Sequence, residues 1–187
     1  MMKPNSHILL IGYRGSGKST VGKLLADVLQ CEFVDTDDKV EEAAGKSITA
    51  IFEHDGESVF RDLETLAIRT CVGAVSKTVI SLGGGAILRE ENQQLLTAAG
   101  SVIWLRGSPE NLFQRITQDM TSGSRRPKLL HSDNDSQDDH DGYAEIVEVL
   151  RNRTPIYSSL ANFTVETDGK DPEDIVEEII QSLRPSV

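Results

Sequence analysis

The sequence has few of the residues that mark several classes of protein. Its two cysteines, Cys31 and Cys71, form no C-x-x-C pair, so neither a disulfide framework nor a cysteine-bound metal is indicated. We expect both to be small buried side chains. Positive charge is also scarce, because 19 lysines and arginines stand against 30 acidic residues, for a net charge of −11. A nucleic-acid-binding surface needs a basic face, so this balance argues against one.

Long apolar runs are missing as well. No stretch approaches the length of a membrane-spanning helix. Lys3 is followed by an apolar segment, but that segment runs directly into the glycine-rich stretch 12–20, and cleavage of a signal peptide there would destroy it. The 187 residues are enough for one domain of ordinary size. We therefore expect a single domain over residues 1–187, a cytoplasmic monomer with no membrane or nucleic-acid partner.

The glycine-rich stretch matches a complete phosphate-binding motif. Residues 12–20 read G-Y-R-G-S-G-K-S-T and fit G-x-x-x-x-G-K-[ST]. A short apolar run, 7–11, precedes them, and 21–29 have apolar residues at helical spacing, which gives the order strand, turn, helix that a phosphate cradle requires. Glycines let backbone N–H groups approach phosphate oxygens, and the start of a helix adds partial positive charge. A turn without a ligand is the alternative, but the motif in this context predicts a bound nucleoside triphosphate.

The chemistry of the motif assigns roles to its last residues. Lys18 would reach the outer phosphates, and the Ser19 hydroxyl would be a ligand of Mg²⁺. The residues predicted to hold the nucleotide are Gly15, Ser16, Gly17, Lys18, Ser19 and Thr20.

Two aspartates follow the next predicted strand. Residues 32–35 form a short strand that ends in Asp35, and Asp37 comes two positions later. In an open α/β sheet the carboxyl ends of the strands face the ligand crevice, so both are candidates for contact with a metal or a substrate. Asp37 could instead only cap the predicted helix 38–44, or do both, and the sequence leaves this open.

Two further features have an ordinary and a functional interpretation. On a predicted helix over 56–72, Arg61 and Glu64 are three residues apart, which is also the spacing of a simple surface ion pair. A third strand, 77–82, ends in Gly83, Gly84 and Gly85. These glycines either present bare backbone N–H groups at the crevice or form a flexible turn.

The rest of the chain continues to alternate helices and strands. The expected elements are helices at 91–98, from Pro109, at 143–157 and from Pro172, with strands at 101–105 and 162–166. This alternation predicts a three-layer α/β/α sandwich with a five-stranded, mainly parallel sheet. Periodicity disappears from about 121 to 142, where a lid or a disordered loop is expected. Its acidic tract, 131–141, does not fit a calcium loop and is more typical of solvated charge.

Taken together, these segments resemble the shikimate kinase family, small P-loop kinases of the nucleoside-monophosphate-kinase type. The resemblance covers nearly the whole chain. It rests on the phosphate loop, Asp35-Thr36-Asp37, Phe60-Arg61-x-x-Glu64, Gly83-Gly84-Gly85, Arg126-Pro127 and Arg153-Thr154-Pro155-Ile156-Tyr157. It implies ATP and Mg²⁺ as cofactors and transfer of the γ-phosphoryl to the 3-hydroxyl of shikimate, on the route to chorismate and the aromatic amino acids.

The resemblance also implies roles at the substrate. Arg61 and Arg153 would bind the carboxylate of shikimate, because a guanidinium suits planar two-point pairing. Asp37 would accept or orient the proton of the reacting hydroxyl. Backbone groups of 83–85 would hydrogen-bond the ring substituents, and Asp35 would hold Mg²⁺ through water beside Ser19.

At the nucleotide, Lys18 and Arg126 would stabilise charge on the transferring phosphoryl group. Arg115 would stack on the adenine, beside a loop at 167–172. Lys128 and the acidic tract depart from the usual lid of the family, which leaves the geometry of the lid open.

Two rival functions are compatible with the phosphate loop. The first is another small-metabolite kinase, of the gluconate type, and the second is a nucleotide-binding regulatory module without catalysis. The combination of Asp37, Arg61, Arg153 and the three glycines argues against the first, because it describes a substrate with a carboxylate and several hydroxyls. Intact Lys18, Asp37 and Arg61 argue against the second.

Overall fold

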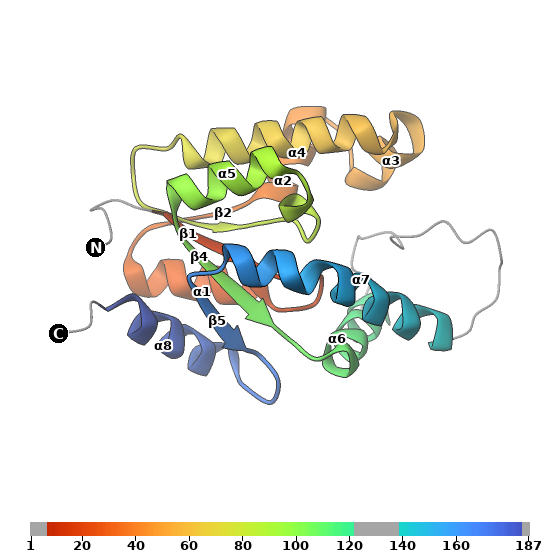
Figure 1. Cartoon of the computed structure of the whole chain (residues 1–187). Coiled ribbons are helices and arrows are strands. Elements are labelled where there is room, and N and C mark those ends of the chain that lie inside the picture. Colours follow the sequence, from red (N-terminus) through yellow and green to blue (C-terminus); the bar gives the residue numbers. More distant parts are fainter. Residues whose placement is uncertain (1–6, 122–138, 185–187) are drawn as a thin grey trace.

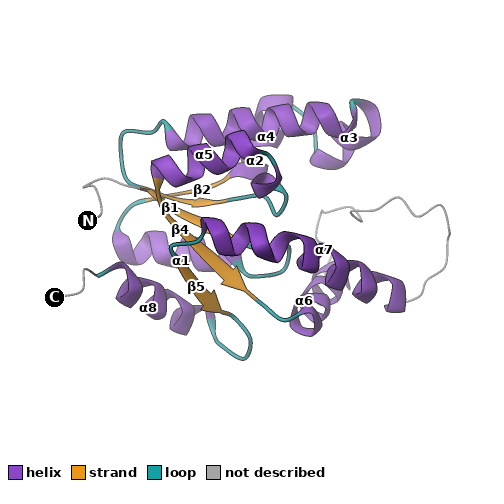
Figure 2. Cartoon of the chain, viewed as in Figure 1, coloured by secondary structure: helices purple, strands orange, loops and turns teal. Residues whose placement is uncertain are grey.

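The computed structural model of the chain describes residues 7–121 and 139–184. Five parallel strands run through the centre of this part (Figures 1 and 2). They are β1 (His7–Ile11), β2 (Glu32–Asp35), β3 (Thr78–Ser81), β4 (Gly100–Arg106) and β5 (Phe163–Glu166), in the spatial order β2-β3-β1-β4-β5. In the register of the central strands, Leu9 lies opposite Ile80 on β3 and Val102 on β4. The predicted parallel sheet is confirmed.

Helices cover both faces of the sheet, as Figure 1 shows. They are α1 (Lys18–Leu29), α2 (Thr36–Ala44), α3 (Ile48–His54), α4 (Gly56–Val72), α5 (Glu90–Ala99), α6 (Pro109–Thr121), α7 (Asp139–Leu160) and α8 (Pro172–Leu183), with a 3-10 turn η1 (Ala86–Leu88). None of these helices is long and apolar enough to cross a membrane, within the residues described.

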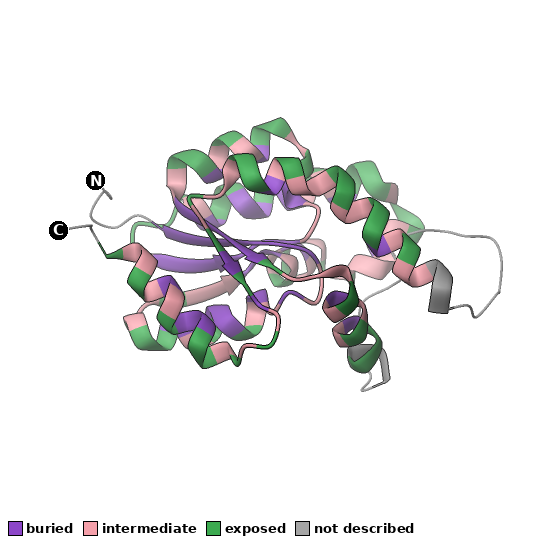
Figure 3. Cartoon of the chain, turned by 60° about the horizontal axis from the view of Figure 1, so that its bottom comes forward, coloured by how far each residue is buried: buried purple, intermediate pink, exposed green. Residues whose placement is uncertain are grey.

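Alternate residues of β1 supply the two main cores. Ile8 and Leu10 pack with residues of α1 and α8, whereas Leu9 and Ile11 pack with residues of α4, α5 and α7. This is the period of two that a strand imposes on its side chains. Every residue of β1 is buried, and Figure 3 shows the strands as the buried centre under helices with exposed outer faces. Apolar residues on both faces therefore fix β1 in the middle of the sheet.

Two smaller apolar clusters lie outside these cores. One joins Val40 of α2 and Ile51 of α3 to Phe60 on α4. The other joins Tyr13, in the loop after β1, to α6 and α7. Residues of both groups line one cavity, which is described below. One cluster therefore packs α2, α3 and α4 together, and the other packs α6 and α7 against the phosphate loop.

Some details differ from the sequence-based expectations. Asp35, rather than Asp37, caps α2, because its carboxylate accepts a hydrogen bond from the Asp37 N–H at 3.1 Å. Cys71 is buried, but Cys31 is only half-buried. The helix α7 begins at Asp139, so the end of the segment expected as a lid is helical. The remainder of that segment, including Arg126, Lys128 and most of the acidic tract, lies outside the described residues.

Candidate active site

The phosphate loop joins the end of β1 to the start of α1. Gly12, Gly15 and Gly17 have φ angles of 149°, 78° and 89°, in the region that favours glycine. At Gly12 the packing also requires glycine, because an added Cβ would lie 2.5 Å from the carbonyl oxygen of Leu105. The loop therefore needs glycine for its backbone shape and for its close approach to β4.

Polar groups of this loop converge around its centre. The buried Lys18 Nζ donates to the carbonyl oxygens of Gly12 and Tyr13, both at 2.9 Å. The buried Ser16 hydroxyl has no hydrogen-bond partner among the described residues, and a buried polar group without a partner is costly. A phosphate group would supply an acceptor for both residues. Thr20, by contrast, is exposed.

The donor set for a cation lies beside the loop. Ser19 Oγ donates to Asp35 Oδ2 at 2.7 Å, and Asp35 Oδ1 accepts from the Asp37 N–H at 3.1 Å. One hydroxyl and one carboxylate are few ligands for an all-protein metal cage. They fit Mg²⁺, which takes its other ligands from phosphate and water.

A cavity opens next to the phosphate loop at the carboxyl edge of the sheet. Helices α2, α3, α4 and α7, the loop after β1 and the loop after β3 all contribute to it. Its lining comprises Tyr13, Arg14, Asp37, Ile48, Phe52, Phe60, Arg61, Glu64, Gly83, Gly84, Gly85 and Arg153. The structure thus brings together the residues predicted to contact the substrate.

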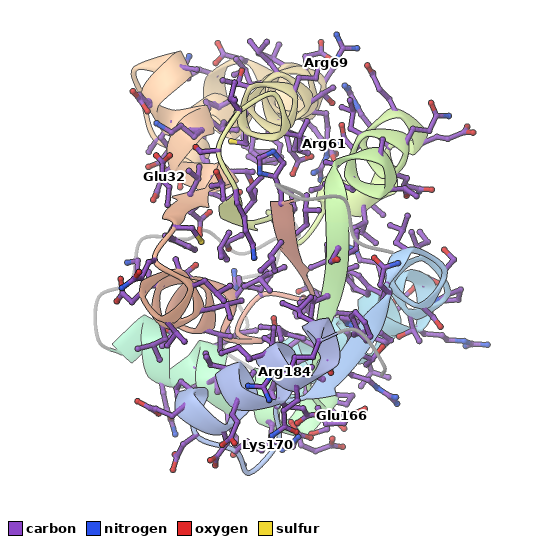
Figure 4. The ribbon with its side chains drawn as sticks, turned by 90° about the vertical axis from the view of Figure 1, so that its left-hand side faces the viewer. Glu32, Arg61, Arg69, Glu166, Lys170 and Arg184 are labelled. Carbon is purple, nitrogen blue, oxygen red and sulfur yellow. The ribbon has the colours of Figure 1, made fainter. Side chains whose placement is uncertain are left out.

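Arg61 and Glu64 form a buried pair rather than a surface pair. Arg61 Nη1 donates to Glu64 Oε2 at 2.8 Å, and the Glu64 side chain is 1% exposed. Burial raises the pKa of Glu64, against the opposing effect of Arg61. Burial alone would lower the pKa of Arg61, but Glu64 and Glu57 outweigh it and raise that pKa. In Figure 4, Arg61 lies on the side of α4 toward the sheet, and Arg69 extends from the outer side.

The triple glycine is closely surrounded by these charged groups. A Cβ on Gly83 would lie 2.6 Å from Asp37 Oδ1 and 3.1 Å from Glu64 Oε1. A Cβ on Gly85 would lie 2.6 Å from Arg61 Nη1. The backbone can thus approach both carboxylates and the guanidinium only because these residues lack side chains.

Helix α7 reaches the same loop from the other side. Arg153 Nη1 and the hydroxyl of Tyr157 both donate to the carbonyl oxygen of Gly84, each at 2.9 Å. The Arg153 guanidinium also lies over the ring of Tyr13, 6.0 Å from its centroid. Arg153 therefore lies on the cavity wall beside both the phosphate loop and the triple glycine.

Arg115, on α6, does not line this cavity. It donates to Thr167 Oγ1 at 3.2 Å and to the Thr167 carbonyl oxygen at 2.8 Å. Next to it, the Asp168 carboxylate accepts from the Ser108 N–H at 3.0 and 3.2 Å. Burial would raise the pKa of Asp168, but hydrogen bonds from Ser108 and Asn111 and the charge of Arg115 lower it. These contacts join α6 to the turn after β5.

Some cavity residues were not anticipated from the sequence. Ile48, Phe52 and Phe60 form an apolar wall, in which the rings of Phe52 and Phe60 lie 4.6 Å apart. Ile48 and Phe52 are four residues apart on α3, a spacing equally typical of an ordinary core, so only Phe60, through the segment Phe60-Arg61-x-x-Glu64, had a sequence signal of its own. Tyr13 and Arg14 occupy variable positions of the phosphate motif, where the motif specifies no side chain.

A phosphate loop at the carboxyl edge of a parallel sheet, beside a cavity with charged side chains and an apolar wall, defines a P-loop kinase of a small molecule. Comparison with known proteins specifies the family. The family model for shikimate kinase matches residues 14–184. Shikimate kinase from Rhodopirellula baltica is 38% identical over 186 residues, covering 100% of this chain and 94% of the relative. The chain belongs to the shikimate kinase family.

Solved structures agree with this assignment. Shikimate kinase from Acinetobacter baumannii in complex with shikimate superposes with a TM-score of 0.82 at 32% identity, covering 94% of this chain and 91% of that one. A gluconokinase from Sinorhizobium meliloti has a TM-score of 0.61 at 20% identity, with coverages of 96% and 91%, which shows a shared fold alone. The predicted P-loop fold class is confirmed.

Proposed function

We propose that the protein transfers the γ-phosphoryl group of ATP to the 3-hydroxyl of shikimate, giving shikimate 3-phosphate and ADP. Membership of the shikimate kinase family supports this function. The observation that carries it is the meeting of the phosphate loop with a cavity that holds Asp37, Arg61 and Arg153. A carboxylate beside two arginines suits a substrate that bears both a reactive hydroxyl and a carboxylate.

Arg61 and Arg153 would bind the substrate carboxylate. A guanidinium has five N–H donors in a planar fork, so each arginine can keep its present partner and still donate to a ligand. Arg61 is held by Glu64, and Arg153 by the Gly84 carbonyl. Both are therefore oriented before a substrate arrives, which lowers the entropic cost of binding. The backbone of Gly84 and Gly85 would contact the ring hydroxyls, whereas the Gly83 N–H already donates to Thr36 Oγ1 at 3.0 Å.

The phosphate loop would hold the nucleotide through residues 15–20. Lys18 would exchange its two backbone carbonyl acceptors for phosphate oxygens and stabilise charge on the transferring group. Ser19 and Asp35 would hold Mg²⁺, which bridges phosphate oxygens and neutralises their charge when it is bound. Arg126 would add a second cation from the lid, a role that rests on the resemblance to the family, because Arg126 lies outside the described residues.

Asp37 would orient the reacting hydroxyl and accept its proton. Its carboxylate lines the cavity beside Gly83 and Glu64, and it is close to the metal ligand Asp35. Arg115 would stack on the adenine, near the Thr167 backbone that it already contacts. The reacting groups would thus lie between the phosphate loop and α4.

The setting of this activity is also a proposal. We propose one domain over residues 1–187 with a lid at about 121–142. We further propose that the protein acts as a cytoplasmic monomer in the synthesis of chorismate and the aromatic amino acids. The net charge of −11 supports the expectation that no nucleic acid is bound.

The two rival functions are not favoured. Similarity to gluconokinase extends to the fold alone. A regulatory module without catalysis would not need Lys18, Asp37 and Arg61 to be intact. Asp37 and Arg61 line one cavity beside the phosphate loop, which carries Lys18.

Release of ADP with a panel of acceptors tests the proposal. Shikimate, quinate, gluconate and nucleoside monophosphates would each be added with ATP and Mg²⁺. Of these acceptors, we expect only shikimate to give rapid ADP release. Faster turnover of gluconate would favour the first rival, and ADP release with none of the acceptors would favour the second.

A further inference from the structure

The carbonyl oxygen of Gly84 accepts two hydrogen bonds from a single helix. Arg153 and Tyr157 are four residues apart, so they project from one face of α7 on successive turns. Each donor atom lies 2.9 Å from the Gly84 oxygen. A carbonyl oxygen has two lone pairs, so α7 occupies both. Arg153 and Tyr157 lie 69 and 73 positions after Gly84 in the sequence.

Fixing this carbonyl also fixes the neighbouring N–H group. The Gly84 C=O and the Gly85 N–H belong to the same trans peptide unit and point in opposite directions. Gly85 lines the cavity, and within the described residues its N–H has no hydrogen-bond acceptor. A carbonyl held toward α7 therefore leaves a donor that is available to a ligand on the other side.

The two donors differ in what a substrate would do to them. Arg153 lines the cavity, where its guanidinium would be shared between the Gly84 carbonyl and a substrate carboxylate. Tyr157 is 0% exposed, and its ring stacks on Trp104 at 5.4 Å with an interplanar angle of 19°. Burial raises the pKa of Tyr157 to about 12, so the hydroxyl stays protonated as a donor. Tyr157 is thus a donor without a competing ligand.

We infer that Tyr157 is a positioning residue, whose hydroxyl holds the Gly84–Gly85 peptide so that the Gly85 N–H faces the substrate. It holds this peptide together with Arg153, whose guanidinium also serves the substrate carboxylate. The inference rests on the proposed function, because it takes shikimate as the ligand of the cavity.

Tyr157→Phe tests this role because it removes only the hydroxyl and keeps the stacked ring. We expect the KM for shikimate to rise about fivefold to tenfold, the scale of one hydrogen bond. The KM for ATP should stay within twofold. Isothermal titration calorimetry would measure shikimate binding directly, and thermal melting would measure the Tm, which should fall by only a few degrees.

A matched control lies on the same helix. The hydroxyl of Tyr143 donates to Glu110 at 2.5 Å, and neither residue lines the cavity. Tyr143→Phe makes the same chemical change and should leave both KM values unaltered. A second test combines Tyr157→Phe with Arg153→Ala. If the two side chains hold one carbonyl, losing the hydroxyl should raise the KM for shikimate by a larger factor in the Arg153→Ala background than in the parent.

The outcomes separate this inference from the proposed function. An unchanged KM for shikimate in Tyr157→Phe overturns the inference. A lower Tm with unchanged shikimate binding also overturns it, because the hydroxyl would then have a purely structural role. Equal losses for ATP and shikimate overturn it as well. A parent that releases no ADP with shikimate contradicts the proposed function, yet calorimetry on parent and variant still tests Tyr157. Absence of shikimate binding to the parent contradicts both.

Discussion

The phosphate loop takes its residues from consecutive positions 12–20, whereas the adjacent cavity is lined from several separate segments. In the loop, Lys18 bonds to carbonyl groups only five and six positions away. In the cavity, Gly84 is held by side chains 69 and 73 positions away. The two halves of one site therefore depend on contacts of different range.

This difference has a physical consequence for how each half responds to change. The loop depends mainly on backbone angles that glycine allows, which are set locally, and at Gly12 also on a close approach to Leu105 of β4. The cavity depends on close approaches between elements, such as Arg61 on α4 to Gly85 after β3. A defect in the loop should therefore weaken nucleotide binding, and a defect in the cavity should weaken shikimate binding. Variants in each half test that separation.

The largest effect is expected from Asp37→Asn. The amide cannot take the proton of the reacting hydroxyl, so turnover should fall by about 10²–10⁴-fold, the usual contribution of a general base. Shikimate should still bind within a few-fold of the parent, because both arginines remain. Single-turnover kinetics with calorimetric binding would measure the two effects. Near-normal turnover at neutral pH would remove Asp37 from the role of base.

Arg61→Lys should weaken shikimate binding by about 10–100-fold, the scale of hydrogen bonds to a charged group. A lysine keeps the charge but loses the planar fork that pairs with a carboxylate. The KM for ATP should stay nearly constant. Arg69→Lys is the matched control, because Arg69 lies on the same helix and pairs with the exposed Glu91. Equal losses for both substrates would mean that Arg61 serves the fold.

Two glycine substitutions should have reciprocal effects. Gly12→Ala places a Cβ 2.5 Å from a backbone oxygen at a φ of 149°, so the KM for ATP should rise by about tenfold, consistent with 1–3 kcal/mol of strain. Gly85→Ala, at a φ of −99°, causes no such strain but pushes against Arg61, so the KM for shikimate should rise instead.

Gly84→Ala is the control for this pair, since its Cβ would meet nothing closer than 3.5 Å. It should therefore cost less than Gly85→Ala in shikimate binding. Steady-state kinetics with each substrate varied in turn would measure all three variants. The separation of the two halves would be disproved if Gly12→Ala and Gly85→Ala affected both KM values alike.

The smallest effect concerns stability at the Arg115 end of the site. The pKa of Asp168 is lowered in the folded chain, so its ionised form stabilises the fold above the ordinary value of 3.8. That contribution is lost as the pH falls through the lower, folded pKa. Asp168→Asn should reduce stability by about 1 kcal/mol at pH 7, or a few degrees in Tm. The difference from the parent should shrink as the pH falls below 3.8.

Asp171→Asn is the control for that measurement. Asp171 is exposed and makes no side-chain capping bond at the start of α8. Melting curves between pH 3 and pH 8 should show little change for this variant. A pH-independent loss in Asp168→Asn would show that its charge does not contribute.

Much of the fold follows from the sequence because it depends on local patterns. The five strands and most helices lie where apolar periodicity places them, and Pro109 and Pro172 begin their helices as expected. The cap of α2 shows the limit of such reasoning. The sequence pointed to Asp37 as a possible cap, whereas the structure uses Asp35, whose carboxylate accepts from the Asp37 N–H. No spacing rule separates two carboxylates that lie two residues apart.

The sequence by itself determined the phosphate loop, because the backbone angles, the lysine and the helix start lie within one short segment. It also determined the family, through motifs in a fixed order. Only the tertiary structure decided that Glu64 is buried against Arg61 rather than exposed to solvent. It likewise decided that Tyr157 meets Gly84, because long-range packing of α7 against the loop after β3 is not encoded in any local period.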